Sequence, residues 1–259
     1  MGIFGWRTLG FFQVVVPVVL GGASAFIPVP VSAQDYAAYL GRRIIGGLAA
    51  EPEAELSAAL ADAIEATAHE LGLKPGRSPS STVSILRQRP DRVGLLALGD
   101  SVIVLPGEVV TDERIDGLRL AQRDEYRRRL AAGSGYDDRH RELLRQLQTE
   151  QAERRNVEGG YWIAEAEPKA AEHALQVSRP ASAVRWAVLA TDGAYTTMTR
   201  LRLDDWPQVA EANETGLAAL LDRCQVWEPD VDPDGRQLPR AKRHDDKTIA
   251  AVHLDHIPS

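Results

Sequence analysis

The chain has 259 residues, of which 44% are hydrophobic and 26% are charged, as is ordinary for a soluble globular protein. This length favours one large domain over two small ones. The formal net charge of −7 argues against nucleic acid as a partner, because phosphate contacts need a basic face. The single cysteine, Cys224, excludes an internal disulfide, and we expect its side chain to be buried on a helix.

The amino-terminal apolar run has two interpretations. Residues 8–34 carry no charge, and the small residues at 31–34 resemble the cleavage site of a secretory signal. The run is interrupted by prolines and glycines, which suits a membrane-spanning helix poorly. Its β-branched part, 14–20, favours a buried strand that leads to a turn at Gly21-Gly22, although Pro17 cannot donate to a sheet. We therefore favour a strand and a cytoplasmic protein, with export through a signal as the alternative.

Two helices and a three-stranded antiparallel meander are predicted next. Leucine and isoleucine recur every fourth residue from Leu56, and Gly72 ends that pattern, as is typical of an amphipathic helix. Short apolar segments separated by turn residues then predict strands, with Asp100 at one tip of the meander. The helices are expected at 35–50 and 53–71, and the strands at 79–86, 93–98 and 102–105.

The middle of the chain, 112–158, is predicted to be a charged helical insertion interrupted by a loop at 131–136. We expect Leu143, Leu144 and Leu147 to contact the core, and His140 to lie on the surface. An irregular stretch follows, from 159 to 180.

The central strand is expected at 186–190, where an apolar run ends in Thr-Asp-Gly at 191–193. A helix is predicted at 204–224 and a polar loop at 229–242. Two more carboxylates, Asp245 and Asp246, directly precede a second apolar strand at 249–254.

Aspartates at the ends of strands have two interpretations. Asp192 and Asp245 are suited to a hard cation, because hard cations prefer oxygen ligands. Asp-Gly and Asp-Asp pairs also form turns without any ligand, and for one pair alone that interpretation is favoured.

Four landmarks nevertheless occur in a characteristic order: Gly-Gly-Ala-Ser at 21–24, Ser-Ser-Thr at 80–82 with Gly-Asp-Ser at 99–101, Thr-Asp-Gly at 191–193, and Asp-Asp-Lys-Thr at 245–248. This order resembles the PPM family, the type 2C metal-dependent protein serine/threonine phosphatases, in their bacterial single-domain form. Each motif alone is weak, and the resemblance depends on all four together.

The resemblance implies an α/β (α+β) fold, an α-β-β-α sandwich of two mainly antiparallel sheets flanked by helices. It implies a site for two Mg²⁺ or Mn²⁺ ions whose bridging water attacks a phosphoester of a phosphoprotein substrate. The residues matching the metal positions are Asp192, Asp245, Asp100 for a weaker third ion, and Gly22 through its backbone carbonyl. Asp246 and Gly193 match supporting positions, and no further catalytic residue is assigned.

Two departures from the family pattern concern the amino terminus. The bridging aspartate of the family is replaced by Gly21, and no strand with a phosphate-binding arginine precedes residue 14. We expect 1–13 to be a divergent segment and 14–259 to be a single PPM-like domain. The loss of a bridging carboxylate predicts weak metal binding and reduced hydrolysis. The alternative is a catalytically inactive PPM-like module that binds or regulates a protein partner.

Overall fold

The computed structural model describes residues 16–23 and 29–254. The expected divergent segment 1–13 lies outside the described residues, as does the beginning of the expected first strand. No helix within the described ranges is long and apolar enough to cross a membrane.

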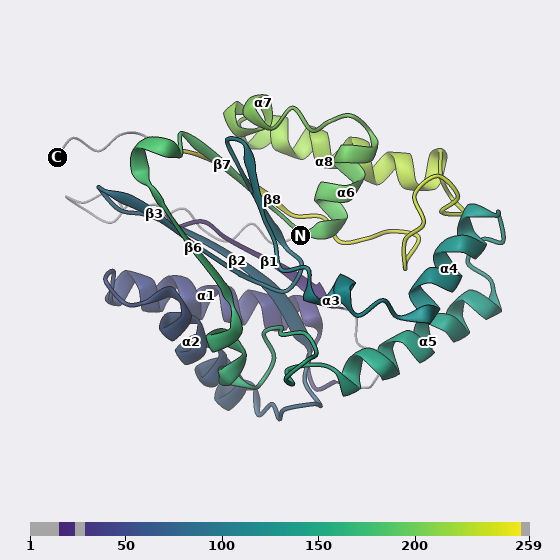
Figure 1. Cartoon of the computed structure of the whole chain (residues 1–259), viewed down its shortest axis with the longest axis horizontal. Helices are drawn as coiled ribbons and strands as arrows, with labels where there is room; N and C mark the ends of the chain where they lie inside the picture. Colours follow the sequence, from purple (N-terminus) through teal and green to yellow (C-terminus); the bar gives the residue numbers. More distant parts are fainter. Residues whose placement is uncertain (1–15, 24–28, 255–259) are drawn as a thin grey trace.

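Two antiparallel four-stranded sheets pack face to face in the part of the chain that the structure describes (Figure 1). The first sheet has the order β1-β2-β3-β6, and the second has the order β5-β4-β7-β8. The strands are β1 (Val18–Ala23), β2 (Ser80–Gln88), β3 (Arg92–Leu98), β4 (Val102–Leu105), β5 (Glu108–Val110), β6 (Leu175–Pro180), β7 (Trp186–Ala190) and β8 (Ile249–His253).

Helices cover the outer face of each sheet (Figure 1). Two of them pack on the first sheet and three on the second, so the layers run helix, sheet, sheet, helix. This confirms the predicted α-β-β-α sandwich. The helices are α1 (Ala33–Ala50), α2 (Leu56–Leu71), α3 (Arg114–Gly117), α4 (Ala121–Ala131), α5 (Asp138–Glu153), α6 (Asp192–Arg200), α7 (Trp206–Glu211) and α8 (Glu214–Asp230), with short 3-10 helices η1 (Pro168–His173) and η2 (Ala181–Ala183).

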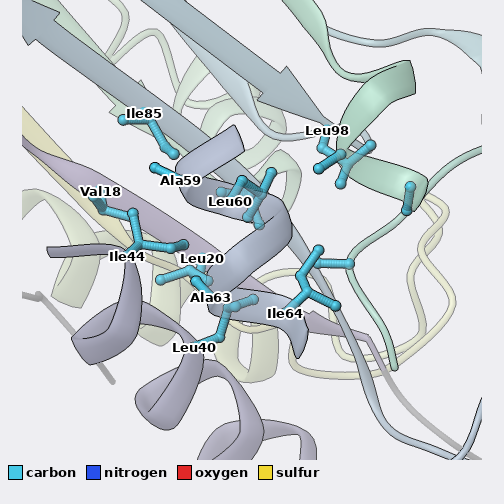
Figure 2. Close-up of a cluster of buried hydrophobic side chains, with 14 of the residues drawn as sticks. Val18, Leu20, Leu40, Ile44, Ala59, Leu60, Ala63, Ile64, Ile85 and Leu98 are labelled. Atoms are coloured by element: carbon cyan, nitrogen blue, oxygen red, sulfur yellow. The ribbon is translucent and has the colours of Figure 1, made fainter. Parts of the chain in front are cut away.

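Alternating side chains on the strands fill the spaces between these layers. On β1, Val18 and Leu20 face the α1–α2 layer, whereas Val19 faces the second sheet. This is the alternation that places successive strand residues on opposite faces of a sheet. Figure 2 shows the layer between α1, α2 and the first sheet, where Leu60 is fully buried. The layers are therefore fixed by apolar burial on both faces of the sheets.

The first strand extends further than the sequence predicts. We expect a turn at Gly21-Gly22, but both residues continue β1, and Gly21 pairs with Thr82 of β2. The prediction of a turn is wrong because glycine in a strand also permits a close approach of neighbouring chain segments. Pro17 immediately precedes the strand, where its missing N–H removes no ladder bond.

The predicted meander is divided between the two sheets. β2 and β3 pair in the first sheet, whereas β4 pairs with β5 and β7 in the second. Asp100 therefore lies where the chain crosses between sheets. The stretch expected to be irregular contains β6, an edge strand whose side chains are mostly exposed and lack an apolar pattern.

Helix boundaries account for the other differences. The helices at 33–50 and 56–71 confirm the two predicted ones. The Asp-Gly pair at 192–193 begins α6 rather than forming a turn. The helix expected at 204–224 is two helices, because Asn213 caps a new one by accepting a hydrogen bond from the Gly216 N–H at 2.9 Å.

The charged insertion forms helices α3, α4 and α5, of which α4 and α5 extend beside the sandwich (Figure 1). Leu143, Leu144 and Leu147 pack with Leu130 in a separate cluster, so they do not join the main core as expected. His140 is 2% exposed, which makes its expected surface position wrong. The insertion therefore has a small core of its own.

Candidate metal site

Three aspartates from separate parts of the chain line one cavity of about 510 Å³. Asp100 lies just before β4, Asp192 just after β7, and Asp245 before β8. Because β7 is antiparallel to both β4 and β8, the end of β7 and the beginnings of its neighbours meet at one edge of the sheet. The order of the strands therefore brings together three aspartates that are far apart in the sequence.

The segment around Asp192 is hydrogen-bonded to the loop that carries Asp245. The Thr191 N–H donates to the Thr248 carbonyl at 3.0 Å, and the Thr191 hydroxyl accepts from the Thr248 N–H at 3.1 Å. A Cβ atom on Gly193 would lie 2.8 Å from the Asp246 carbonyl oxygen. Glycine at this position therefore permits the close approach of the two segments.

Two of the three aspartates at the cavity have raised pKa values. Burial, reinforced by the charges of Asp116 and Asp245, raises the pKa of Asp100 to about 6. Burial, together with the charges of Asp100 and Asp245, raises the pKa of Asp192 to about 8. Asp192 is surrounded by protein but faces the solvent in the cavity, where a cation can reach it. Clustered carboxylates of this kind are stabilised by positive charge.

The carboxylates do not form a ready-made metal site in the part of the chain that the structure describes. Among residues 16–23 and 29–254, no three His, Cys, Asp or Glu side chains already stand in the arrangement of a metal site. Mg²⁺ usually keeps several waters and takes one or two carboxylates plus substrate phosphate. Asp192 and Asp245 provide oxygens of that kind, but they do not provide a ligand that bridges two ions.

The position of the expected bridging ligand is filled by other side chains. A Cβ on Gly21 would lie 2.8 Å from Thr82 Oγ1 and 3.1 Å from Thr191 Cγ2. Thr82 Oγ1 also accepts from the Gly21 N–H at 3.2 Å and lies 2.5 Å from Ser101 Oγ. The described residues therefore leave little space for a carboxylate on residue 21.

Gly22, predicted as a backbone metal ligand, and Asp246, predicted as a supporting residue, have different surroundings. Gly22 lines the cavity, and a Cβ there would lie 3.2 Å from Ala33 at the beginning of α1. Asp246 is largely exposed, and its N–H donates to Asp245 Oδ1 at 3.0 Å. This bond orients the Asp245 carboxylate.

Basic side chains line the same cavity, and the sequence reasoning missed them. They come from the loop before β2, from α5 and the residues after it, and from the loop before β8. Helix α5 was expected to face solvent, and its charge pattern alone does not show that one face borders a cavity. The residues are Arg77, Arg145, Arg155 and Lys242.

The sequence matches no protein-family model and no curated protein. The fold is similar to that of several solved phosphatases. Serine/threonine phosphatase Stp1 from Staphylococcus aureus superimposes with a TM-score of 0.56 at 10% identity, over 98% of this chain and 87% of that chain. A bacterial serine phosphatase carrying a point mutation gives 0.55 at 10% identity, over 100% and 92% of the two chains.

The PPM Ser-Thr phosphatase MsPP from Mycobacterium smegmatis, solved in complex with cacodylate, gives a TM-score of 0.51 at 15% identity. That match covers 98% of this chain and 97% of that chain. Identities this low establish a shared fold, and the chemistry of the site has to be argued from its own residues.

Proposed function

We propose that this chain is a PPM-type phosphatase that removes phosphate from serine or threonine in proteins with low, Mg²⁺- or Mn²⁺-dependent activity. The observation that carries the proposal is the meeting of Asp100, Asp192 and Asp245 at one cavity. The similarity of the whole fold to solved PPM phosphatases supports it.

The roles proposed for the residues follow from their chemistry. Asp192 and Asp245 hold the ion, with the Gly22 carbonyl beside it, and Asp100 adds negative charge that favours cation binding. A bound divalent ion supplies a water of lowered pKa and neutralises phosphoryl oxygens. Arg155 and its basic neighbours line the cavity where they can attract a phosphorylated side chain.

A second candidate function is favoured by one observation. The space beside Gly21 is occupied by Thr82 and Thr191, so the bridging ligand expected for the family has no place. A chain with this packing can also serve as an inactive PPM-like module that binds a phosphoprotein or regulates another protein. Hydrolysis and cation binding distinguish the two candidates.

The test is hydrolysis of p-nitrophenyl phosphate with and without Mn²⁺. We expect a low Mn²⁺-dependent rate that Asp192→Ala reduces about 100-fold or more, because losing even an outer-shell partner costs about 10–100-fold. Asp62→Ala is the matched control, because Asp62 is exposed on α2, away from this cavity. Hydrolysis unaffected by Mn²⁺ or by Asp192→Ala contradicts the proposal. A folded protein that neither hydrolyses the substrate nor is stabilised against heat by Mn²⁺ favours the second candidate.

A further inference from the structure

A lysine from the loop before β8 lies among the carboxylates of the candidate metal site. Lys242 Nζ is 3.5 Å from Asp245 Oδ1 and 3.4 Å from Asp246 Oδ2. Its side chain lines the cavity that Asp100 and Asp192 also line. Within residues 16–23 and 29–254, no other Lys, Arg or His nitrogen approaches the carboxylates of Asp100, Asp192 or Asp245 within 4.0 Å.

The ammonium group is shared between two carboxylates. Direct charge-assisted hydrogen bonds are about 2.7–2.9 Å long, and both distances here are longer and nearly equal. A divalent ion bound at Asp245 would neutralise the same carboxylate that Lys242 neutralises here. Lys242 and such an ion therefore compete for Asp245 Oδ1.

The backbone that carries Lys242 is held in place from the helical insertion. The Tyr136 hydroxyl donates to the Lys242 carbonyl at 3.2 Å, and His140 Nε2 donates to the Ala241 carbonyl at 2.9 Å. His140 is buried between the rings of Tyr126 and Tyr136. This anchoring keeps the lysine at the cavity.

The same loop is also attached to α8, because Arg240 Nη2 donates to the Glu228 carbonyl at 3.4 Å. Arg240 Nη1 donates to Asp232 Oδ2 at 2.7 Å, and Arg240 Nε donates to the Arg243 carbonyl at 3.0 Å. Both Arg240 and Asp232 are buried. Lys242 therefore extends from a loop that is anchored on two sides.

We propose that Lys242 is a built-in counter-ion of the carboxylate cluster, which neutralises Asp245 in the absence of metal and weakens divalent-cation binding. The inference rests on the proposed function, because it concerns the same site. Lys242 also provides positive charge to a site in which Gly21 replaces the expected bridging ligand. When an ion displaces the ammonium group, Lys242 remains at the cavity, where it can contact a phosphate oxygen.

The test is calorimetric titration of Mn²⁺ into the full chain and three variants. We expect Lys242→Gln to bind Mn²⁺ about fivefold more tightly than the wild type, because a partly exposed ion pair contributes up to about that factor. Lys242→Arg keeps the charge and should stay within about twofold of the wild type. Lys169→Gln is the control: Lys169 is exposed, outside this cavity, and its loss changes the net charge equally.

Equal affinities of the wild type and Lys242→Gln, or no binding by either, overturn the inference. A similar gain in Lys169→Gln also overturns it, because the effect is then one of net charge alone. The p-nitrophenyl phosphate assay distinguishes a failure of this inference from a failure of the proposed function. Tighter binding by Lys242→Gln without any phosphatase activity supports the counter-ion and defeats the catalytic proposal, whereas metal-dependent hydrolysis with unchanged affinity does the reverse.

Discussion

At Gly21, strand β1 passes so close to Thr82 and Thr191 that a Cβ atom would overlap their side chains. Thr82 cannot easily rotate away, because its hydroxyl bonds the Gly21 N–H and contacts Ser101. The glycine is thus favoured by the local packing. Adding a carboxylate here would require both threonines to move.

Gly21→Ala should lower the free energy of unfolding by about 1–3 kcal/mol, the usual cost of overpacking a filled interior site. Gly46→Ala is the matched control, because a Cβ at this exposed position of α1 meets nothing within 4 Å. It should stabilise the chain by about 0.5–1 kcal/mol, as alanine does in a helix interior. Urea denaturation measures both changes. An alanine at residue 21 that leaves the urea midpoint unchanged would contradict the packing argument.

The sequence predicts some residue-level features of the site better than others. The order of motifs predicts that Asp100, Asp192 and Asp245 come together, and all three line one cavity. The obstruction beside Gly21 could not be predicted, since it depends on the side-chain positions of two other strands. The position of Lys242 depends on loop geometry, which no periodic pattern encodes.

At the scale of elements, the loop between α8 and β8 is held by buried charges. The Asp232 carboxylate accepts hydrogen bonds from the Arg240 guanidinium and from the backbone N–H groups of Gln237 and Leu238. Glu228, fully buried on α8, pairs with Lys247 at 2.5 Å. These bonds fix both ends of the segment that carries Lys242 and Asp245.

Arg240→Met should lower the free energy of unfolding by about 3–5 kcal/mol, because it leaves the buried Asp232 carboxylate unpaired. Arg236→Met is the control, because Arg236 belongs to the same loop but is exposed. Thermal denaturation compares the two variants. If both unfold at the same temperature, the buried ion pair does not anchor the loop.

The elements themselves were predicted where apolar periodicity is strong. α1, α2 and β7 follow from their patterns, because each buries one continuous apolar face or run. β6 was not predicted, because most side chains of this edge strand are exposed and do not form an apolar pattern. Asp192 begins a helix instead of a turn, since Asp-Gly suits both a turn and the first turn of a helix.

For the whole molecule, the sandwich positions the site and the helical insertion forms part of the cavity wall. The two sheets bring three strand ends to one edge, and α5 lines the cavity beside them. The insertion has its own apolar cluster, and it contacts the loop before β8 through Tyr136 and His140. The fold class was predictable from the order of the motifs. The packing of the insertion against the loop before β8 was not predictable, because the sequence of a charged helix does not indicate which segment it contacts.

The central claim is that one divalent cation binds between the ends of these strands. Crystals grown with Mn²⁺, measured by anomalous X-ray scattering, test it most directly. The account predicts a single ion at about 2.1 Å from carboxylate oxygens of Asp192 and Asp245, the distance typical of a small hard cation, and its loss in Asp192→Asn. A Mn²⁺-saturated crystal with no ion at these aspartates, or with its ions bound elsewhere, would contradict the account.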